Sequence, residues 1–382
     1  MNVIYIMNEH YPFGMAATMR VKLFSEFLVN HHHNVNVLIS NQDNGDNKKT
    51  GINNGVKYST LCNIKLPTLI YLLFYPFVAF YKLLLLKQKN IVNVLIIYSG
   101  VNLFNLQFII FGKLLGYKVV IDAVEDNISS TEDMKILSRL NIRATEMILP
   151  YISNFIDGVT VISMRLLDKY QLLYKNHPIK LLPISAANIN FIYKSNKIDK
   201  KLKFVYAGSY GNKDGVLLLI NAFDKLSNKY PDIQLLLLGK ITKESLRKIQ
   251  LLENKNIIHL GYLDEKNYWL KLCEADILCM TRVDSLYANA GFPFKLGEYL
   301  ATRRPVIVTD TSDIKHYLTD KKDCVMAKPS DEVSLIEAIE YLIKNPDKRK
   351  KIGNNGYNTC LKFFNPEING KILLNYLKNI SS

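Results

Sequence analysis

The chain has 382 residues, of which 48% are hydrophobic, and its 49 Lys and Arg against 34 Asp and Glu give a net charge of +15. This length favours two domains, and the hydrophobic fraction excludes global disorder. The five cysteines form no CxxC pair, which argues against a disulfide framework or zinc knuckle and fits a reducing cytoplasm. No signal peptide is expected from the first residues.

The positive charge is spread over both halves, so anionic membrane surfaces and nucleotide phosphates are suitable partners. No nucleic-acid partner is expected, because no zinc finger, RNP-type or helix-turn-helix signature is present.

The N-terminal half alternates strands with helices. An unbroken apolar strand over 3–6 precedes a loop, a helix over 17–29 and a strand over 35–39. Further strands are expected over 94–98, 119–122 and 158–162, with a helix over 104–115. Continuous apolar strands separated by helices are typical of a parallel sheet covered on both faces.

One segment, 66–86, is unusually apolar, with Lys82 as its single charge and lysines on its flanks. Its length approaches the roughly 20 residues that span a bilayer, but Pro76 lies in its middle and aromatic residues run throughout. A membrane-interface helix and a buried core helix are the two main alternatives, and a true span is the least favoured.

The charge-dense stretch 193–203 marks a linker, after which the alternation of strands and helices begins again. Strands are expected over 204–207, 233–238, 257–260, 277–280 and 306–308. The sequence therefore predicts an α/β fold of two Rossmann-like, doubly wound domains that face a central cleft. They comprise residues 1–193 and 194–362, and a C-terminal helix over 363–382 can pack back on the first domain.

Three loops carry candidate chemistry, because ligands of doubly wound sheets bind at the carboxyl ends of strands. The loop over 9–17 holds Gly14, which lets backbone amides approach an anion at a helix N-terminus, although an ordinary turn is the alternative. The loop over 207–215 has three glycines before a helix and can hold a diphosphate, although it matches neither a Walker A loop nor GxGxxG.

The third element, NAGFPFKLGEYLA over 289–301, is the most specific. Lys295 and Glu298 lie three residues apart on one helix face. A carboxylate there can accept hydrogen bonds from two vicinal hydroxyls of a ribose, and the lysine can neutralise a departing phosphate. A surface ion pair is the alternative.

With these motifs, the whole chain resembles GT-B-fold retaining glycosyltransferases of the family 4 type, in a branch with the signature FPxKxxEYLA. The resemblance extends to 206–208, 260–262, 275–277, 33–37 and 345–364. It implies transfer of a sugar, with retention of configuration, from a nucleotide diphosphate donor, a UDP- or GDP-sugar, to a hydroxyl acceptor, without a metal or other cofactor. The apolar segment 66–86 and the charge of +15 add the hypothesis of a lipid-linked glycan acceptor in cell-surface polysaccharide biosynthesis, and of a cytoplasmic enzyme peripheral to the inner face of the cell membrane.

The resemblance assigns roles to particular residues. Catalytic roles are expected of Lys295, Glu298 and Asn289. Donor-binding residues are expected to be Gly14, Gly208, Ser209, Lys213, Gly261, Tyr262, Gly291, Phe292, Pro293, Lys295 and Glu298. Acceptor or sugar binding is expected of His10, Tyr11, Asp122 and Glu125, with helix capping as the alternative for the acids. The triple His31–His33 is not expected to bind a metal, and Trp269 is expected to pack.

The sequence departs from the family at three positions. The first of two glutamates that the family places in this motif falls on Ala290, so its role would pass to Asn289 or to nearby backbone amides. The Arg and Lys of the glycine-bearing loop fall on Ser209 and Asp214. Two alternatives therefore stay open, a nucleotide-sugar 2-epimerase and a catalytically degenerate partner that binds a nucleotide-sugar without turnover.

Overall fold

The computed structural model describes residues 1–62, 67–126, 136–187, 189 and 201–382, and it divides into two compact units. Unit 1 comprises Met1–Ser185, Ala290–Phe292 and Pro366–Ser382; unit 2 comprises Ala186–Asn289 and Pro293–Asn365. The chain enters unit 2 at Ala186, earlier than the predicted boundary after residue 193. The linker predicted over 193–203 lies mainly outside the described residues.

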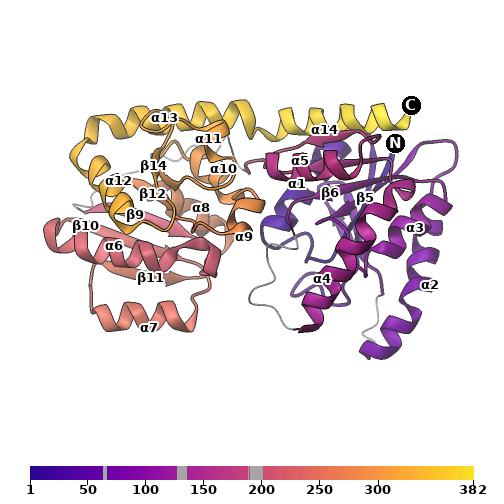
Figure 1. Cartoon of the computed structure of the whole chain (residues 1–382), viewed down its shortest axis with the longest axis horizontal. Helices are drawn as coiled ribbons and strands as arrows, with labels where there is room; N and C mark the ends of the chain where they lie inside the picture. Colours follow the sequence, from indigo (N-terminus) through magenta and orange to yellow (C-terminus); the bar gives the residue numbers. More distant parts are fainter. Residues whose placement is uncertain (63–66, 127–135, 188, 190–200) are drawn as a thin grey trace. The chain divides into compact units, whose positions relative to one another are not determined.

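Unit 1 is built on an eight-stranded sheet in the order β3-β4-β2-β1-β5-β6-β7-β8, in which β3 runs antiparallel to β4 and the other pairs are parallel. Strands β5 and β6 of this sheet are labelled in Figure 1. Every residue of the central β1 is buried, as its unbroken apolar sequence predicts. The strands are β1 (Asn2–Met7), β2 (Asn34–Ile39), β3 (Thr50–Asn53), β4 (Val56–Thr60), β5 (Asn93–Tyr98), β6 (Lys118–Ala123), β7 (Gly158–Val161) and β8 (Ile179–Leu181).

The hairpin of β3 and β4 is the main element of unit 1 that the predicted strands omit. Its turn is Asn54-Gly55, with φ values of 45° and 79°. Both are in the left-handed region that Asn and Gly tolerate, which makes this dipeptide a standard hairpin signal.

The helices of unit 1 are α1 (Ala16–Asn30), α2 (Thr68–Leu86), α3 (Leu106–Leu114), α4 (Ile136–Ile148), α5 (Met164–Leu173) and α14 (Pro366–Ser381), with the 3-10 helix η2 (Leu149–Phe155). The last helix packs on α1, where a Cβ at Gly370 would collide with the ring of Phe27. Asn369 also donates a hydrogen bond of 2.9 Å to the carbonyl oxygen of Ile184. The C-terminal helix is thus part of the N-terminal unit.

Helix α2 is buried on one side only. Tyr75, Ala79 and Leu83 recur every four residues and are buried, and the rings of Tyr75 and Phe108 on α3 meet at 5.9 Å. Phe77, at 73% exposure, and Leu85, at 60%, lie on the other side. Among the described residues, no helix has both the length and the apolar character needed to cross a membrane.

Unit 2 is a six-stranded parallel sheet in the order β11-β10-β9-β12-β13-β14. Its strands are β9 (Leu202–Ala207), β10 (Ile233–Leu238), β11 (Ile257–Gly261), β12 (Ile277–Met280), β13 (Val306–Thr309) and β14 (Val325–Ala327). Its helices are η3 (Asn212–Asp214), α6 (Val216–Lys229), α7 (Lys243–Leu252), α8 (Glu265–Glu274), α9 (Leu286–Ala290), α10 (Phe294–Ala301), α11 (Ile314–Tyr317), α12 (Glu332–Lys344) and α13 (Pro346–Phe363).

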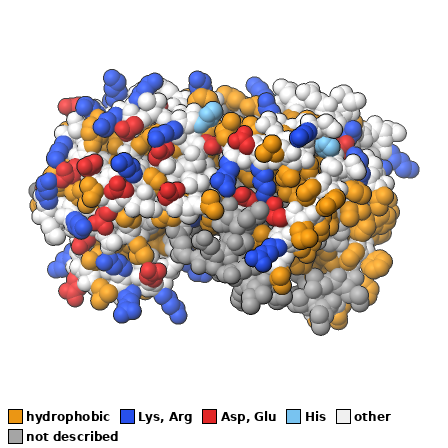
Figure 2. Space-filling model, in the orientation of Figure 1, with side chains coloured by type: hydrophobic (Ala, Val, Ile, Leu, Met, Phe, Trp, Pro, Cys, Tyr) orange, Lys and Arg blue, Asp and Glu red, His pale blue; other side chains and the backbone are white. Residues whose placement is uncertain are grey.

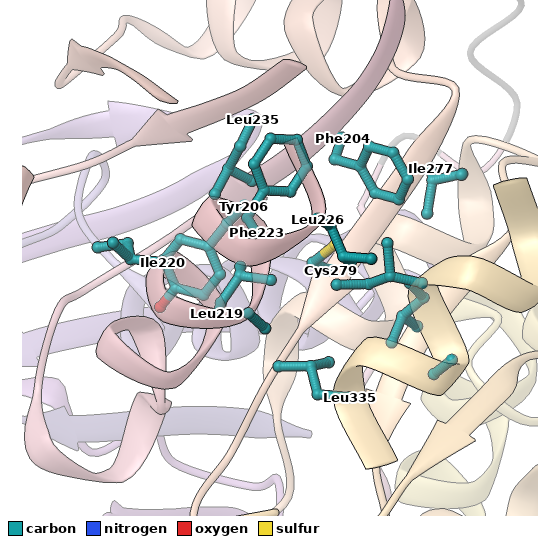
Figure 3. Close-up of a cluster of buried hydrophobic side chains, with 14 of the residues drawn as sticks. Phe204, Tyr206, Leu219, Ile220, Phe223, Leu226, Leu235, Ile277, Cys279 and Leu335 are labelled. Carbon is teal, nitrogen blue, oxygen red and sulfur yellow. The ribbon is translucent and has the colours of Figure 1, made fainter. Parts of the chain in front are cut away.

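The core of unit 2 lies between β9, β10 and the helices that cover them (Figure 3). Phe204 on β9 and Phe223 on α6 meet edge to face, with ring centroids 5.5 Å apart, and both are fully buried. This packing fixes the carboxyl end of β9, where the glycine-bearing loop begins.

Candidate functional site

The candidate site of unit 2 lies where the strand order reverses. Strand β9 has β10 on one side and β12 on the other, so the loops that follow β9 and β12 diverge at this point. Two glycines keep the backbone there compact: a Cβ at Gly239, whose φ is 121°, would collide with the carbonyl oxygen of Gly208. The loops after β9 and β10 therefore lie against each other at the point where doubly wound folds bind a ligand.

The ammonium of Lys295 lies directly over Gly208. A Cβ at Gly208 would collide with Lys295 Nζ, and the same Nζ lies 5.4 Å from the centroid of the Tyr206 ring. The side chain is partly exposed, and in the described part of the chain no carboxylate is within ion-pair distance of it. Burial lowers the pKa of Lys295. A cation held in this way, with no anion from the described residues paired to it, is suited to a phosphate.

Glu298 lies one turn further along α10 and is only 8% exposed. The hydroxyl of Tyr268, on α8, donates a hydrogen bond of 2.7 Å to its Oε2. Burial raises the pKa of Glu298 to about 7, against the opposing effects of this hydrogen bond and of Lys295. The pair Lys295 and Glu298 is therefore not a surface ion pair, which removes the alternative that the sequence left open.

The glycine-bearing loop is held by its own polar groups. Tyr206 donates a hydrogen bond of 2.5 Å from its hydroxyl to the carbonyl oxygen of Ser209, and the Ser209 hydroxyl donates to the carboxylate of Asp214. Thr281, just after β12, donates to the carbonyl oxygen of Asp214 at 3.1 Å. The ammonium of Lys213 lies 4.2 Å from the ring centroid of Tyr287. The two positions where the family carries basic residues thus form a hydrogen bond with each other.

The remaining predicted residues of unit 2 lie around these loops. Gly261 ends β11 with a φ of 79° and accepts a hydrogen bond of 2.8 Å from the amide of Gly239. Tyr262, which follows it, is 75% exposed, and Pro293 immediately precedes α10.

Asn289 is held by the fold at both ends of its amide. Its Nδ2 donates to Asp284 at 2.9 Å, and its Oδ1 accepts from the amide of Ser312 at 2.9 Å. These two hydrogen bonds hold the side-chain amide of Asn289 in one orientation. Its catalytic role in place of the absent glutamate stays a prediction.

Gly291 and Phe292 belong to unit 1, together with Ala290. The hydroxyl of Ser163 donates a hydrogen bond of 2.9 Å to the carbonyl oxygen of Ala290, and a Cβ at Gly291 would lie 3.3 Å from the carbonyl oxygen of Val124. The structure therefore groups these two residues with the N-terminal unit and not with Lys295 and Glu298.

Asp122, predicted to bind a sugar, forms a buried ion pair instead. Arg20 on α1 donates from Nε and Nη2 to the two carboxylate oxygens, both at 2.9 Å, and Thr160 donates to Oδ1 at 2.8 Å. Arg20 and Asp122 are 1% and 3% exposed. The carboxylate of Asp122 is therefore committed to the core of unit 1.

Residues of the loop after β1 also form hydrogen bonds with other residues of unit 1. Tyr11 is fully buried, exchanges backbone hydrogen bonds with the Asn44 side chain at 2.8 Å, and has its pKa raised to about 12 by burial. Thr18 donates to the carbonyl oxygen of His10 at 2.5 Å, and a Cβ at Gly14 would collide with the Thr18 hydroxyl. Tyr11 is thus a core residue. The side chains of His10 and of Glu125, which follows β6, are exposed.

Sequence reasoning missed Tyr268 and Arg20. The sequence predicts only that the next residue, Trp269, packs, and Trp269 is buried at 5% exposure. The one feature of the sequence that could have indicated Tyr268 is its position next to Trp269, because the hydroxyl of a tyrosine beside a buried residue usually forms a hydrogen bond. Among the described residues, no group of three or more His, Cys, Asp or Glu could hold a metal ion.

Residues 188–359, which form most of unit 2, match the model of the family described as glycosyl transferases group 1. A phosphatidyl-myo-inositol mannosyltransferase of Mycobacterium leprae is 24% identical over 148 residues, so the match spans 38% of this chain and 38% of that protein.

Two solved structures match over the whole fold. Sucrose-phosphate synthase of Thermosynechococcus elongatus has a TM-score of 0.77 at 15% identity, covering 99% of this chain and 98% of that one. HepE of Anabaena, in complex with UDP and glucose, has a TM-score of 0.73 at 14% identity, covering 99% of each chain. The chain thus has the α/β fold of GT-B glycosyltransferases.

Proposed function

We propose that this chain is a glycosyltransferase of group 1, whose family model matches residues 188–359, and that it is a retaining enzyme of the family 4 type that transfers a sugar from a nucleotide diphosphate to a hydroxyl of a glycan. The observation that carries the proposal is the pair on α10: an ammonium over Gly208 that has no paired carboxylate among the residues that the structure describes, and a nearly buried carboxylate one turn away. These are the two charges that a diphosphate and a ribose require.

In the proposed reaction, the bond between the anomeric carbon and the diphosphate oxygen breaks, and a bond to the acceptor oxygen forms with the same configuration. The acceptor hydroxyl loses its proton, which passes to the leaving diphosphate or to solvent. Negative charge grows on the diphosphate, so the cation of Lys295 and the amides of the loop after β9 stabilise the transition state more than the ground state. Glu298 holds the ribose hydroxyls.

Alanine at Lys295 or Glu298 tests this assignment. Each substitution is expected to reduce turnover by well over tenfold, which corresponds to more than about 1.4 kcal/mol in the barrier. Lys271→Ala is the matched control, because Lys271 and Glu274 have the same spacing on α8 but form a partly exposed ion pair at 2.8 Å. Turnover near that of the wild type for both site variants would show that the donor binds elsewhere.

The donor nucleotide is proposed to be UDP or GDP. HepE, which has the same fold, has been solved with UDP-glucose. A ligand that binds only the native state raises the melting temperature. In a thermal-shift panel of nucleoside diphosphates, the nucleotide that raises it most therefore identifies the base of the donor. An activity assay with the nucleotide-sugar alone separates the alternatives, because consumption of the donor without any acceptor favours an epimerase. Binding without transfer to any lipid-linked glycan favours a degenerate partner, which Ala290 makes worth testing.

The acceptor is proposed to be a lipid-linked glycan at the cytoplasmic face of the membrane, in cell-surface polysaccharide assembly. Figure 2 shows hydrophobic side chains gathered at the right edge of the molecule, over α2 and α3. Phe77, Leu85 and Leu114 are 60% exposed or more, and Lys87 and Lys89 follow α2 directly. An apolar helix face with basic flanks favours binding to an anionic interface.

The membrane proposal is tested by sedimentation with anionic vesicles. Replacing Phe77 and Leu85 together by Glu is expected to reduce vesicle binding more than tenfold, because each removes an apolar contact and adds a repelled charge. Leu251→Glu on α7 is the control, since Leu251 is equally exposed, at 71%, but lies in unit 2. Equal sedimentation of the double variant and the wild type would refute the proposal.

A further inference from the structure

The hydrogen bond between Tyr268 and Glu298 joins two helices that are distant in sequence. In the part of the chain that the structure describes, Tyr268 is the only group that donates a hydrogen bond to Glu298, and it reaches Oε2. We propose that Tyr268 is a positioning residue of the donor site, which turns Oε2 inward so that Oε1 accepts the ribose hydroxyls of a nucleoside diphosphate. This inference rests on the proposed function of Glu298.

The direction of this hydrogen bond is fixed. Burial and the adjacent carboxylate raise the pKa of Tyr268 well above its usual value, so its hydroxyl keeps its proton and always donates. A hydrogen bond to a carboxylate is stronger than one between neutral groups and holds the acceptor in one orientation. Glu298 therefore presents the same oxygen to a ligand each time.

Besides the orientation of Glu298, the hydrogen bond from Tyr268 also affects its charge. Four titratable groups interact with it: Tyr268 and Glu265 on α8, and Lys295 and the buried Tyr299 on its own helix. Burial and Glu265 favour the protonated acid, whereas Tyr268 and Lys295 favour the carboxylate. The carboxylate accepts hydrogen bonds at both oxygens, whereas protonation turns one oxygen into a donor. Tyr268 thus keeps Glu298 able to bind a ribose at neutral pH.

Tyr268→Phe separates this role from packing. The substitution removes one hydroxyl and retains the ring, which meets Trp269 edge to face with centroids 5.9 Å apart. Without the hydroxyl, the pKa of Glu298 rises further, so a larger fraction is protonated at pH 7. Tyr230→Phe is the matched control, because Tyr230 also donates from its hydroxyl to a glutamate of unit 2, Glu340, at 3.3 Å.

The experiment is calorimetric titration of the full chain with UDP, or with GDP if that nucleotide is preferred, between pH 6 and 9. Wild-type affinity is expected to rise with pH around 7, as Glu298 ionises. Tyr268→Phe is expected to bind about tenfold more weakly at pH 7 and to recover above pH 8, whereas Tyr230→Phe follows the wild type. The preference for the nucleotide over its 2′-deoxy analogue is also expected to fall in Tyr268→Phe.

A double-mutant cycle with Glu298→Gln completes the test. If Tyr268 acts through Glu298, Tyr268→Phe has little further effect in the Glu298→Gln background. An unchanged pH midpoint in Tyr268→Phe, or a full additional loss in the double variant, would overturn the inference and leave the proposed function standing. A wild-type protein that binds neither UDP nor GDP at any pH would instead overturn the proposed function.

Discussion

Charged residues near the ends of the strands differ between the two units in how many of their polar atoms are paired with other residues. In unit 1, both oxygens of Asp122 and three nitrogens of Arg20 are engaged by hydrogen bonds inside the core. In unit 2, Lys295 has no paired carboxylate in the described residues, and Glu298 receives one hydrogen bond. A charged group that is fully paired within the protein has a role in the fold. A charged group that is not fully paired by the described residues can instead bind a ligand.

The first loops of the two units show the same contrast. Each follows the first strand of its unit and contains a glycine that a neighbouring side chain approaches closely. At Gly14 the neighbour is the hydroxyl of Thr18, which donates to the carbonyl oxygen of His10. At Gly208 the neighbour is the ammonium of Lys295. One glycine makes room for an internal hydrogen bond and the other for a cation.

The largest expected effect is on the ion pair of unit 1. Asp122→Ala leaves the Arg20 guanidinium buried without its counter-ion, which destabilises a protein by about 3–5 kcal/mol. Urea unfolding followed by circular dichroism measures the loss, and Asp122→Asn is the milder control because its amide oxygen still accepts one hydrogen bond. A variant with wild-type stability but no turnover would make Asp122 a ligand-binding residue and break the comparison.

A smaller effect is expected from adding one methyl group in each first loop. In Gly208→Ala the new Cβ displaces the flexible end of Lys295, so UDP affinity is expected to fall about tenfold with little loss of stability. In Gly14→Ala it displaces the Thr18 hydroxyl, so stability is expected to fall by about 1 kcal/mol, the net contribution of one hydrogen bond.

Calorimetry and thermal unfolding of the two alanine variants measure both quantities. Gly14 was predicted to bind the donor, and loss of UDP affinity in Gly14→Ala would bring the loop of unit 1 back into the donor site. If Gly14→Ala retains the UDP affinity of the wild type, the loop of unit 1 has a structural role and only the loop of unit 2 binds the donor.

The sequence predicts those features that depend on residues close together in the chain. The spacing of Lys295 and Glu298 places them on one helix face, and the apolar strands predict the parallel sheets, because both follow from local periodicity. Tyr268 lies 30 residues before Glu298, and Arg20 lies 102 residues before Asp122. Such pairings depend on tertiary packing. The sequence therefore could not show that Asp122 forms a buried ion pair with Arg20, or that Glu298 accepts a hydrogen bond from the hydroxyl of Tyr268.

The smallest expected effect is at Lys213, which the sequence placed in the donor site. Its ammonium lies 4.2 Å from the ring centroid of Tyr287, an interaction that contributes about 0.5–1 kcal/mol at a partly exposed position. Lys213→Ala is therefore expected to reduce stability within that range and UDP affinity by less than about threefold, with Lys213→Arg as the control that retains the cation over the ring. A loss as large as that of Lys295→Ala would mean that Lys213 leaves Tyr287 to bind the diphosphate, so that two ammonium groups, and not one, replace the basic residues absent at Ser209 and Asp214.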